Sequence, residues 1–298
     1  MRVLIVGCGY VGLPLGVELV RQGHTVFGLR RSALAEAELQ AAGIVPLHAD
    51  ITQPETLAKL PRDFDWVVNC TASGGGGADD YRKIYLEGNR KLMAWLADSP
   101  LKKFIYTSST SVYGQNDGSV VTEKSPAGPD AATSKVLVET EKLLMAAVAE
   151  RQFPAVILRV AGIYGPGRGH SFKQFLRGEA RIDGEGARWL NMIHRDDLIG
   201  VIAAALRDAT PGEIFNAADN EPVSQRDFFV WLAAELKRPM PPAIPADAEA
   251  WRKRGVTNKR VSNAKLRAEL KHEFRFPDFR AGYVAEIARR KSDGGLDF

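Results

Sequence analysis

The chain has 298 residues, of which 45% are hydrophobic and 26% charged, and its formal net charge is +4. These values are typical of a globular protein with one large or two modest domains, and the small charge gives no indication of nucleic-acid binding. Two cysteines are too few for a disulfide framework, and no apolar run reaches the roughly 18 residues of a membrane-spanning helix. We therefore expect a cytoplasmic protein without a nucleic-acid or membrane partner, and we assign no metal ligand.

Short apolar runs alternate with segments of helical periodicity over the first part of the chain. The expected strands are residues 3–6, 25–29, 44–48, 66–70, 104–107 and 155–159. The expected helices are residues 11–21, 33–41, 79–98 and 132–151. Strands that are apolar throughout indicate burial on both faces, and their alternation with helices indicates right-handed crossovers. The sequence therefore predicts an α/β fold with a doubly wound parallel Rossmann sheet.

The alternation ends at a glycine-rich loop, residues 165–169. The later elements that we expect are a helix at 194–206 and a strand at 213–216. We predict an NADP-binding Rossmann domain of residues 1–165 plus 190–218. Residues 166–189 plus 219–298 contain many prolines and are expected to form a smaller, mostly helical C-terminal substrate lobe.

A Gly-x-Gly-x-x-Gly motif joins the first expected strand to the first expected helix. It comprises Gly7, Gly9 and Gly12, with Tyr10 and Val11 before the last glycine. The first glycine allows a tight turn, the second lets the backbone approach a pyrophosphate, and the third lets helix and strand pack closely. The helix N-terminus then offers free N–H groups to the phosphates. The motif predicts a dinucleotide site, with a merely tight turn as the alternative.

The end of the second expected strand distinguishes between the two nicotinamide dinucleotides. A site that prefers NAD usually has Asp or Glu there to hold the ribose 2′-hydroxyl. This chain has Arg30 and Arg31 instead. A guanidinium can bind a 2′-phosphate through two hydrogen bonds, whereas a carboxylate would repel it. We therefore predict NADP as the cofactor; the alternative is that both arginines are solvated charges at a helix start.

A second motif follows the fifth expected strand. Its residues are Thr107-Ser108-Ser109-Thr110-Ser111-Val112-Tyr113-Gly114. The motif resembles the active-site segment of the extended short-chain dehydrogenases/reductases, the NAD(P)-dependent epimerase/dehydratase family. Segments at 158–167, 192–198 and 214–218 extend this resemblance along most of the chain.

The resemblance also implies cofactor contacts beyond the glycine motif. Asp50 and Ile51, after the third expected strand, match the family position that contacts adenine. Thr71 and Ala72 match the loop beside the pyrophosphate and ribose. An isolated Asp after a strand is otherwise a turn or capping residue.

In this family a Ser or Thr works with a Tyr-x-x-x-Lys pair on the next helix. The Tyr exchanges a proton with the substrate hydroxyl, the Lys lowers the pKa of the Tyr and holds the nicotinamide ribose, and the hydroxyl polarises the reacting oxygen. The resemblance implies that Ser109 supplies the polarising hydroxyl and that Lys135 is the lysine of the pair. The position four before Lys135 is Ala131, and residues 114–135 contain no Tyr. The chain therefore resembles an atypical, YeeZ-like subgroup that lacks the usual pair.

Three side chains are candidates for the missing acid/base. Tyr113 belongs to the active-site motif, while Tyr164 and His170 flank the glycine-rich loop at the edge where doubly wound folds bind ligands. By contrast, we expect His194 and Asp197 to be structural, as a satisfied histidine and a helix-capping acid.

Two functions fit these observations. One is an NADP-dependent oxidoreductase or epimerase/dehydratase-like enzyme for a nucleotide sugar or a similar hydroxyl-bearing metabolite. The basic residues that would receive its phosphates are Arg159, Arg168, Arg188 and the stretch 252–260. The other is a non-catalytic NADP-binding sensor or regulatory module, which would explain the loss of the central acid/base.

Two further expectations concern assembly and redox chemistry. The resemblance implies a homodimer formed through the helices at 79–98 and 132–151. Cys8 and Cys70 are expected to end adjacent strands beside the cofactor, either as a redox pair or as small buried residues.

Overall fold

The computed structural model describes residues 1–245 and 257–292, and a seven-stranded parallel sheet forms its centre. The strand order is β12-β7-β5-β4-β1-β2-β3. The strands are β1 (Arg2–Val6), β2 (Thr25–Arg30), β3 (Val45–His48), β4 (Trp66–Asn69), β5 (Lys103–Ser109), β7 (Ala155–Val160) and β12 (Ile214–Ala217). This sheet confirms the predicted Rossmann fold, and each predicted strand overlaps its observed counterpart.

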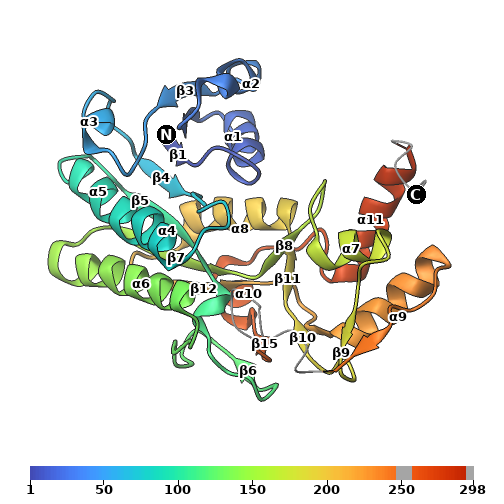
Figure 1. Cartoon of the computed structure of the whole chain (residues 1–298). Helices are drawn as coiled ribbons and strands as arrows, with labels where there is room; N and C mark the ends of the chain where they lie inside the picture. The colour runs from blue at the N-terminus through green and yellow to red at the C-terminus, as the bar shows by residue number, and fades with distance from the viewer. Residues whose placement is uncertain (246–256, 293–298) are drawn as a thin grey trace.

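Helices cover both faces of the sheet (Figure 1). Those of one face are α1 (Gly12–Arg21) and α8 (Arg195–Asp208), and those of the other are α5 (Gly88–Trp95) and α6 (Ala132–Arg151). Alternate residues of β1 explain this arrangement, since Val3 and Ile5 pack in one core cluster and Leu4 and Val6 in the other. After Arg2 the strand is therefore apolar at every position, as expected for a strand covered on both faces.

Short helical segments connect several of these elements. They are η1 (Ala33–Ala35), α2 (Glu36–Ala41), α3 (Pro54–Leu57) and η3 (Thr110–Val112). No helix in residues 1–245 or 257–292 combines the length and apolar content needed to cross a bilayer.

The predicted helix at 79–98 contains a π-helical segment. It consists of α4 (Ala78–Tyr81), the π-helix η2 (Arg82–Glu87) and α5. The buried Asn89 donates from Nδ2 to the Tyr85 carbonyl oxygen at 2.7 Å, and its Oδ1 accepts from Asn69 Nδ2 at 3.0 Å. The π segment is thereby tied to the end of β4. Such segments occur frequently at functional sites, and this one borders the cavity described below.

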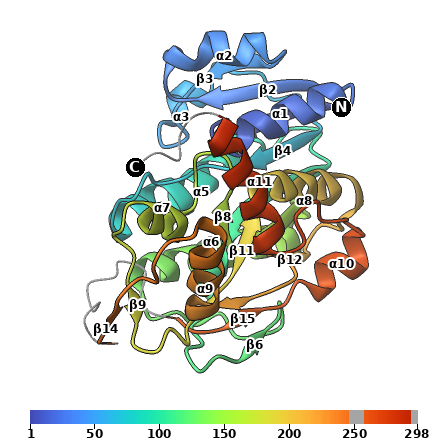
Figure 2. The same ribbon diagram turned by 90° about the vertical axis from the view of Figure 1, so that its right-hand side faces the viewer.

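The second lobe lies beside the sheet, to its right in Figure 1 and toward the viewer in Figure 2. Its helices are α7 (His170–Leu176), α9 (Gln225–Leu236) and α11 (Phe279–Ser292). Its short strands are β9 (Ile182–Asp183), β10 (Trp189–Leu190), β13 (Val223–Ser224) and β14 (Ala243–Ile244). Aromatic side chains such as Phe172, Phe228, Phe279 and Tyr283 form its core. The lobe is helical as predicted, although short strand pairs supplement the helices.

Two further strand pairs and one helix join the lobe to the Rossmann sheet. They are β8 (Gly162–Tyr164) with β11 (Met192–His194), β6 (Val120–Val121) with β15 (Arg260–Val261), and α10 (Ala264–Leu270). Val261, Leu266 and Leu270 pack in the same core cluster as α8. The last part of the chain therefore contributes to the Rossmann core as well as to the lobe, and the domain boundaries stay a prediction.

Candidate active site

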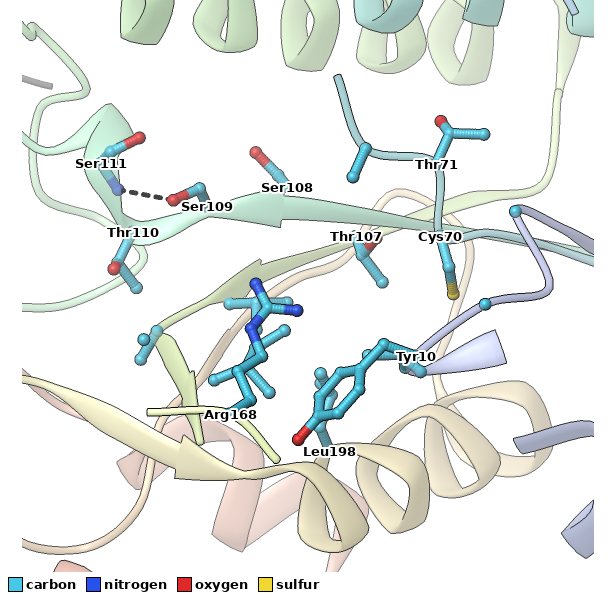
Figure 3. Close-up of a pocket in the computed structure, with 18 of the residues that line it drawn as sticks. Tyr10, Cys70, Thr71, Thr107, Ser108, Ser109, Thr110, Ser111, Arg168 and Leu198 are labelled. Atoms are coloured by element: carbon cyan, nitrogen blue, oxygen red, sulfur yellow. Dashed lines mark hydrogen bonds between the residues drawn. The ribbon is translucent and has the colours of Figure 1, made fainter. Parts of the chain in front are cut away.

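A cavity of about 1280 Å³ lies at the carboxyl ends of β1, β2, β4 and β5, where they face the second lobe. Figure 3 shows its middle part, with Ser109 at the end of β5 and Tyr10 and Arg168 opposite. Ligands bind at this edge in open α/β sheets, because the strand order reverses there and leaves a crevice. The cavity therefore lies where the sequence motifs placed a dinucleotide site.

The glycine motif has the shape that a dinucleotide requires. Gly7 has a φ of +82°, and a Cβ there would lie 2.8 Å from the Thr71 nitrogen. A Cβ on Gly12 would lie 2.7 Å from the Gly7 carbonyl oxygen, so this glycine lets α1 pack against β1. Gly9 faces the cavity, where a side chain would fill space beside the backbone. These residues fit a pyrophosphate at the start of α1.

The end of the cavity beside β2 and β3 carries side chains of both charges. Arg30, Arg31, Asp50 and Ile51 all line it. Arg30 forms an ion pair with Glu38 at 3.0 Å, a partner that sequence analysis missed. Burial raises the pKa of Asp50, but hydrogen bonds from Thr52 and the nearby Arg31 outweigh this effect, so the pKa lies below its ordinary value. Arg31 has no ion-pair partner among the described residues.

The loop after β4 is held by a buried amide. Asn69 Oδ1 accepts hydrogen bonds from the Thr71 nitrogen at 3.1 Å and from the Thr71 hydroxyl at 2.8 Å. The Thr107 hydroxyl donates to the Asn69 carbonyl oxygen at 3.0 Å, which connects this loop to β5. Thr71 and Ala72 line the cavity as a consequence.

Ser109 is half-buried and lines the cavity at the end of β5. Its hydroxyl oxygen accepts a hydrogen bond from the Ser111 nitrogen at 3.2 Å and so caps the short helix η3. The hydroxyl hydrogen has no acceptor in the described part of the chain, which leaves it free to donate to a ligand. The preceding Ser108 instead donates to buried Glu141 at 2.6 Å.

Lys135 does not reach the cavity. Its side chain is exposed, whereas Thr133, Ser134 and Leu137 line the cavity from the same helix. Because α-helical residues advance by about 100° each, a residue two positions away from Thr133 faces nearly the opposite direction. The helix positions four apart that face the cleft are therefore Thr133 and Leu137, not Ala131 and Lys135. Lys135 is therefore not oriented toward the cavity in which we expected it to hold a nicotinamide ribose.

Tyr113 is also outside the cavity, in contrast to our expectation. It is fully buried, and its hydroxyl donates to Asn216 Oδ1 at 2.7 Å and accepts from Arg159 Nη1 at 2.9 Å. Arg159 in turn forms a buried ion pair with Glu141 at 2.7 Å. Both Tyr113 and Arg159 therefore belong to a polar network in the core. Neither is placed to contact substrate, because their polar atoms are already bonded to protein.

The other predicted candidates have different surroundings. Tyr164 borders the cavity but is 1% exposed; its hydroxyl donates to the Asp278 carbonyl oxygen at 3.3 Å, and its ring stacks on Tyr283. Burial raises the pKa of Tyr164, which makes it a poor acid near neutral pH. His170 is exposed at the start of α7 and lines the cavity. Of these, His170 is the better placed to meet a ligand.

His194 and Asp197 both have structural surroundings, but the helix-capping role expected of Asp197 belongs to His194. His194 Nδ1 accepts a hydrogen bond from the Asp196 nitrogen at 3.2 Å and caps α8. Asp197 accepts from the nitrogens of Arg275 and Phe276 at 2.7 and 2.9 Å and anchors the segment before α11. Both side chains are buried.

The cavity is electropositive away from the end that adjoins β2 and β3. The cationic side chains that line it are Arg30, Arg31, Arg168, Lys173, Arg188 and Lys259, and the carboxylates are Glu38 and Asp50. Both carboxylates lie near β2 and β3. Arg188 approaches Asp183 at 3.6 Å, and Arg168 stacks over the Tyr10 ring at 5.1 Å. The lobe side of the cavity therefore carries cationic side chains and, among the described lining residues, no carboxylate.

Of the basic stretch 252–260, residues 252–256 lie outside the described residues, and Lys259 lines the cavity. Sequence analysis missed the burial of Lys259 and the Tyr10–Arg168 contact. Arg195 also approaches the Tyr10 ring, at 5.3 Å. Only the fold brings these residues together, since Lys259 is about 250 positions from the glycine motif. No local pattern in the sequence marks any of these pairings.

The two cysteines are neutral, poorly reactive thiols. Cys8 and Cys70 are not joined by a disulfide. Burial raises the pKa of each thiol to about 12. The thiolate is the reactive form, so these values favour the interpretation as small packing residues over a redox pair. In the described chain, no cluster of three or more His, Cys, Asp or Glu residues is arranged to hold a metal ion.

The chain has a doubly wound parallel sheet, and the glycine motif between β1 and α1 has the shape that a dinucleotide requires. These features define a dinucleotide-binding α/β protein of the Rossmann class. Comparison with known proteins narrows this class. A sequence model of the NAD dependent epimerase/dehydratase family matches residues 3–218. Because the match covers most of the chain, the protein belongs to this family of NAD(P)-dependent enzymes.

Individual relatives support the same assignment. Protein YeeZ of Escherichia coli (strain K12) is 29% identical over 286 residues, covering 93% of this chain and 97% of YeeZ. A structure from Methylobacillus flagellatus, assigned to the NAD-dependent epimerase/dehydratases, is 33% identical with a TM-score of 0.79 and covers 97% of this chain and 98% of its own. UDP-glucuronic acid 4-epimerase from Bacillus cereus, in complex with UDP-glucuronic acid and NAD, has a TM-score of 0.83 at 23% identity, covering 98% and 99%. At this low identity, the similarity to the Bacillus cereus enzyme shows a shared fold alone.

Proposed function

We propose that the protein is an NADP-dependent oxidoreductase or epimerase/dehydratase-like enzyme that acts on a nucleotide sugar or a similar anionic, hydroxyl-bearing metabolite. The observation that carries this proposal is the single cavity that joins the glycine motif to the electropositive lobe side. A bound nicotinamide supplies hydride transfer. Gly7 and Gly9 accommodate the pyrophosphate, and Ser109 donates a hydrogen bond to the reacting oxygen of the substrate.

Support for NADP over NAD comes from Arg30 and Arg31. Glu38 neutralises part of the Arg30 charge, which leaves Arg31 as the main partner for a 2′-phosphate. We expect Arg31→Ala to weaken NADPH binding by about tenfold, equivalent to about 1.4 kcal/mol, while NADH binding changes little. Glu38→Gln should strengthen NADPH binding because it frees Arg30. Titration calorimetry with both cofactors measures these effects, and equal affinity of the wild type for NADH and NADPH would contradict the proposed preference.

Support for an anionic substrate comes from Arg168 and Lys173, which line the lobe side of the cavity. The direct test is turnover, followed as NADPH oxidation or NADP⁺ reduction with a panel of UDP- and dTDP-sugars and their 4-keto forms. We expect turnover with at least one of them, and a raised KM for that substrate in Arg168→Ala. Tight NADPH binding without turnover across the panel would contradict the enzymatic proposal.

A non-catalytic NADP-binding sensor is the second candidate. It is favoured by the two α6 residues four positions apart that face the cavity, Thr133 and Leu137. Neither side chain can exchange a proton near neutral pH, and neither carries a charge that could hold a ribose. In a sensor Ser109→Ala would be silent, and NADPH would change the binding of a protein partner or the conformation of the lobe. In an enzyme the same variant should lose about 10²-fold in kcat, because it removes a hydrogen bond to the reacting oxygen.

We also propose a cytoplasmic homodimer that uses the outer surfaces of α4, α5 and α6. An ion pair between Arg82 of η2, the segment that joins α4 to α5, and Glu139 of α6 connects the two long helices at 2.9 Å across their exposed side. Sedimentation velocity should give a dimer mass, and Arg82→Glu should weaken the association. A monomer at all concentrations tested would remove this part of the proposal.

A further inference from the structure

Lys259 is a buried cation on the cavity wall. It is 4% exposed, and its Nζ donates to the Tyr113 carbonyl oxygen at 2.9 Å and to the Thr257 hydroxyl at 2.8 Å. No carboxylate pairs with it in residues 1–245 or 257–292. An ammonium has three N–H donors, so two protein acceptors leave one donor for a ligand. Buried lysines without an acidic partner are uncommon, because desolvation of the charge is unfavourable.

The backbone around Lys259 is held in place from both sides. The Asn191 side chain donates to the Lys259 carbonyl oxygen at 2.9 Å and accepts from the Val261 nitrogen at 2.7 Å. The Trp189 nitrogen donates to Asn258 Oδ1 at 2.9 Å, and β15 pairs with β6. A fixed backbone, together with the two hydrogen bonds of Nζ, holds the Lys259 side chain in one defined geometry, which proton transfer requires.

Lys259 also lies close to the segment that carries Ser109. Tyr113, whose carbonyl accepts from Lys259, ends the short helix that Ser109 begins. Ser109 and Lys259 line the same cavity. The lysine therefore approaches the active-site segment from the lobe, whereas the family's usual acid/base approaches it from α6.

The acidity of Lys259 suits proton exchange. Burial lowers the pKa of its ammonium from 10.5 to about 8. A general acid or base works best when its pKa is near the working pH, because both protonation states are then populated. The cavity-facing residues of α6, Thr133 and Leu137, have no such group.

We propose that Lys259 is the residue that exchanges a proton with the reacting oxygen of the substrate, in place of the tyrosine that α6 lacks. This inference rests on the proposed oxidoreductase function. In the direction of reduction, hydride from the nicotinamide forms a C–H bond at the carbonyl carbon. The electron pair of the C=O bond moves to oxygen, and this oxygen takes a proton from the Lys259 ammonium. Water reprotonates the amine, and oxidation follows the reverse path.

The first test measures the acidity of Lys259 and requires no substrate. Competitive labelling of the full chain with acetic anhydride, followed by peptide mass spectrometry from pH 6 to 11, gives a titration midpoint for each lysine. We expect Lys259 to titrate near pH 8, and exposed Lys142 is labelled alongside it as the reference lysine. A midpoint for Lys259 equal to that of Lys142, or no labelling at any pH, would overturn the proposal.

The second test separates proton transfer from binding. With the substrate found in the nucleotide-sugar panel, Lys259→Met should lower kcat by about 10²–10⁴-fold at unchanged NADPH affinity. Lys259→Arg keeps the charge but has a pKa too high for exchange, so it should also lose kcat while its KM stays near that of the wild type. Lys142→Met is the matched surface control and should match the wild type.

The outcomes distinguish this proposal from the proposed function. If wild-type turnover is present and Lys259→Arg retains kcat, Lys259 only binds an anionic group and the proton-transfer role is wrong. If Lys259→Met raises only KM, the same conclusion follows. If the wild type binds NADPH but turns over nothing, the oxidoreductase function fails and this inference fails with it. Retained NADPH affinity in each variant shows that the variant is folded.

Discussion

Tyr113 shows how a residue of an active-site motif can serve the core instead. Its hydroxyl bonds Asn216 and Arg159 at full burial, and Arg159 carries a buried charge that Glu141 balances. Removing one partner from such a network leaves buried polar atoms unsatisfied, which costs more than the net value of the hydrogen bond itself. The role of Tyr113 is therefore to support the segment that presents Ser109.

Tyr113→Phe should lower the free energy of unfolding by about 1–3 kcal/mol, because Arg159 and Asn216 each lose a partner. Urea unfolding measures this change. Tyr106→Phe is the matched control, since the buried Tyr106 hydroxyl has no hydrogen-bond partner in the described structure, and its removal should change stability little. A Tyr113→Phe protein with unchanged stability and lost turnover would contradict the structural role.

Lys259 should also affect the pH dependence of stability. Its folded-state pKa is lowered to about 8 from 10.5. Between these values the unfolded chain binds a proton at Lys259 that the folded protein has lost. The contribution of Lys259 to stability is therefore unfavourable below pH 8 and improves as the pH rises toward 10.5. Lys259→Met should lack this increase.

The appropriate measurement is the difference in unfolding free energy between wild type and Lys259→Met from pH 7 to 10. The difference is needed because the raised pKa values of Cys8 and Cys70 act in the opposite direction at high pH. If the difference in unfolding free energy stays constant over this range, Lys259 has the same pKa in the folded and the unfolded protein, which would contradict the prediction.

At the scale of elements, the sequence patterns predicted where the strands lie. They predicted less well which way the side chains of a helix point. Residues 3–6 of β1 are all apolar because both faces are covered, and this signal is local. Lys135 was assigned because it lies at a family-like distance from the motif, but its side chain is exposed and does not line the cavity. The expected helix at 132–151 has the bounds of α6, and the rotation of this helix about its axis turns Thr133 and Leu137 toward the cleft. Tertiary packing sets that rotation, which motif spacing does not report.

Other parts of the site were inaccessible to sequence analysis for a similar reason. The glycine motif and the arginines after β2 were found because each is a contiguous pattern with a physical purpose. Glu38 is eight residues from Arg30, and Lys259 reaches Tyr113 from 146 positions away. Contacts of this kind arise from the packing of whole elements. The π segment η2 was also missed, since it preserves the general helical periodicity.

Gly12 tests the packing of α1 against β1. A Cβ at this position would lie 2.7 Å from the Gly7 carbonyl oxygen and 2.9 Å from Ile5 Cγ2, both in rigid surroundings. Gly12→Ala should therefore lower stability by about 1–3 kcal/mol and weaken NADPH binding, because α1 must move away from the turn. Gly77→Ala is the control, since no atom lies within 4 Å of its added Cβ. Unfolding and NADPH titration of both variants check the prediction, and equal behaviour would contradict it.

At the scale of the whole molecule, the cavity divides into two chemically different ends. The Rossmann sheet supplies the glycine turn, Arg31 and Asp50, whereas the lobe supplies Arg168 and Lys259. A ligand that bridges the two ends would hold sheet and lobe together. Bound NADPH at about 100 times its Kd should thus stabilise the protein by about 2.7 kcal/mol, if it binds only the folded state.

The most direct test of the proposed NADP cleft is a crystal structure of the protein with NADPH. We expect the pyrophosphate on Gly7–Gly12, the 2′-phosphate against Arg31, and the nicotinamide beside Ser109 and Thr133, with Lys259 across an open space sized for a substrate. Lys135 should remain in solvent. A nicotinamide held by Lys135, or a dinucleotide bound outside this cavity, would contradict the account.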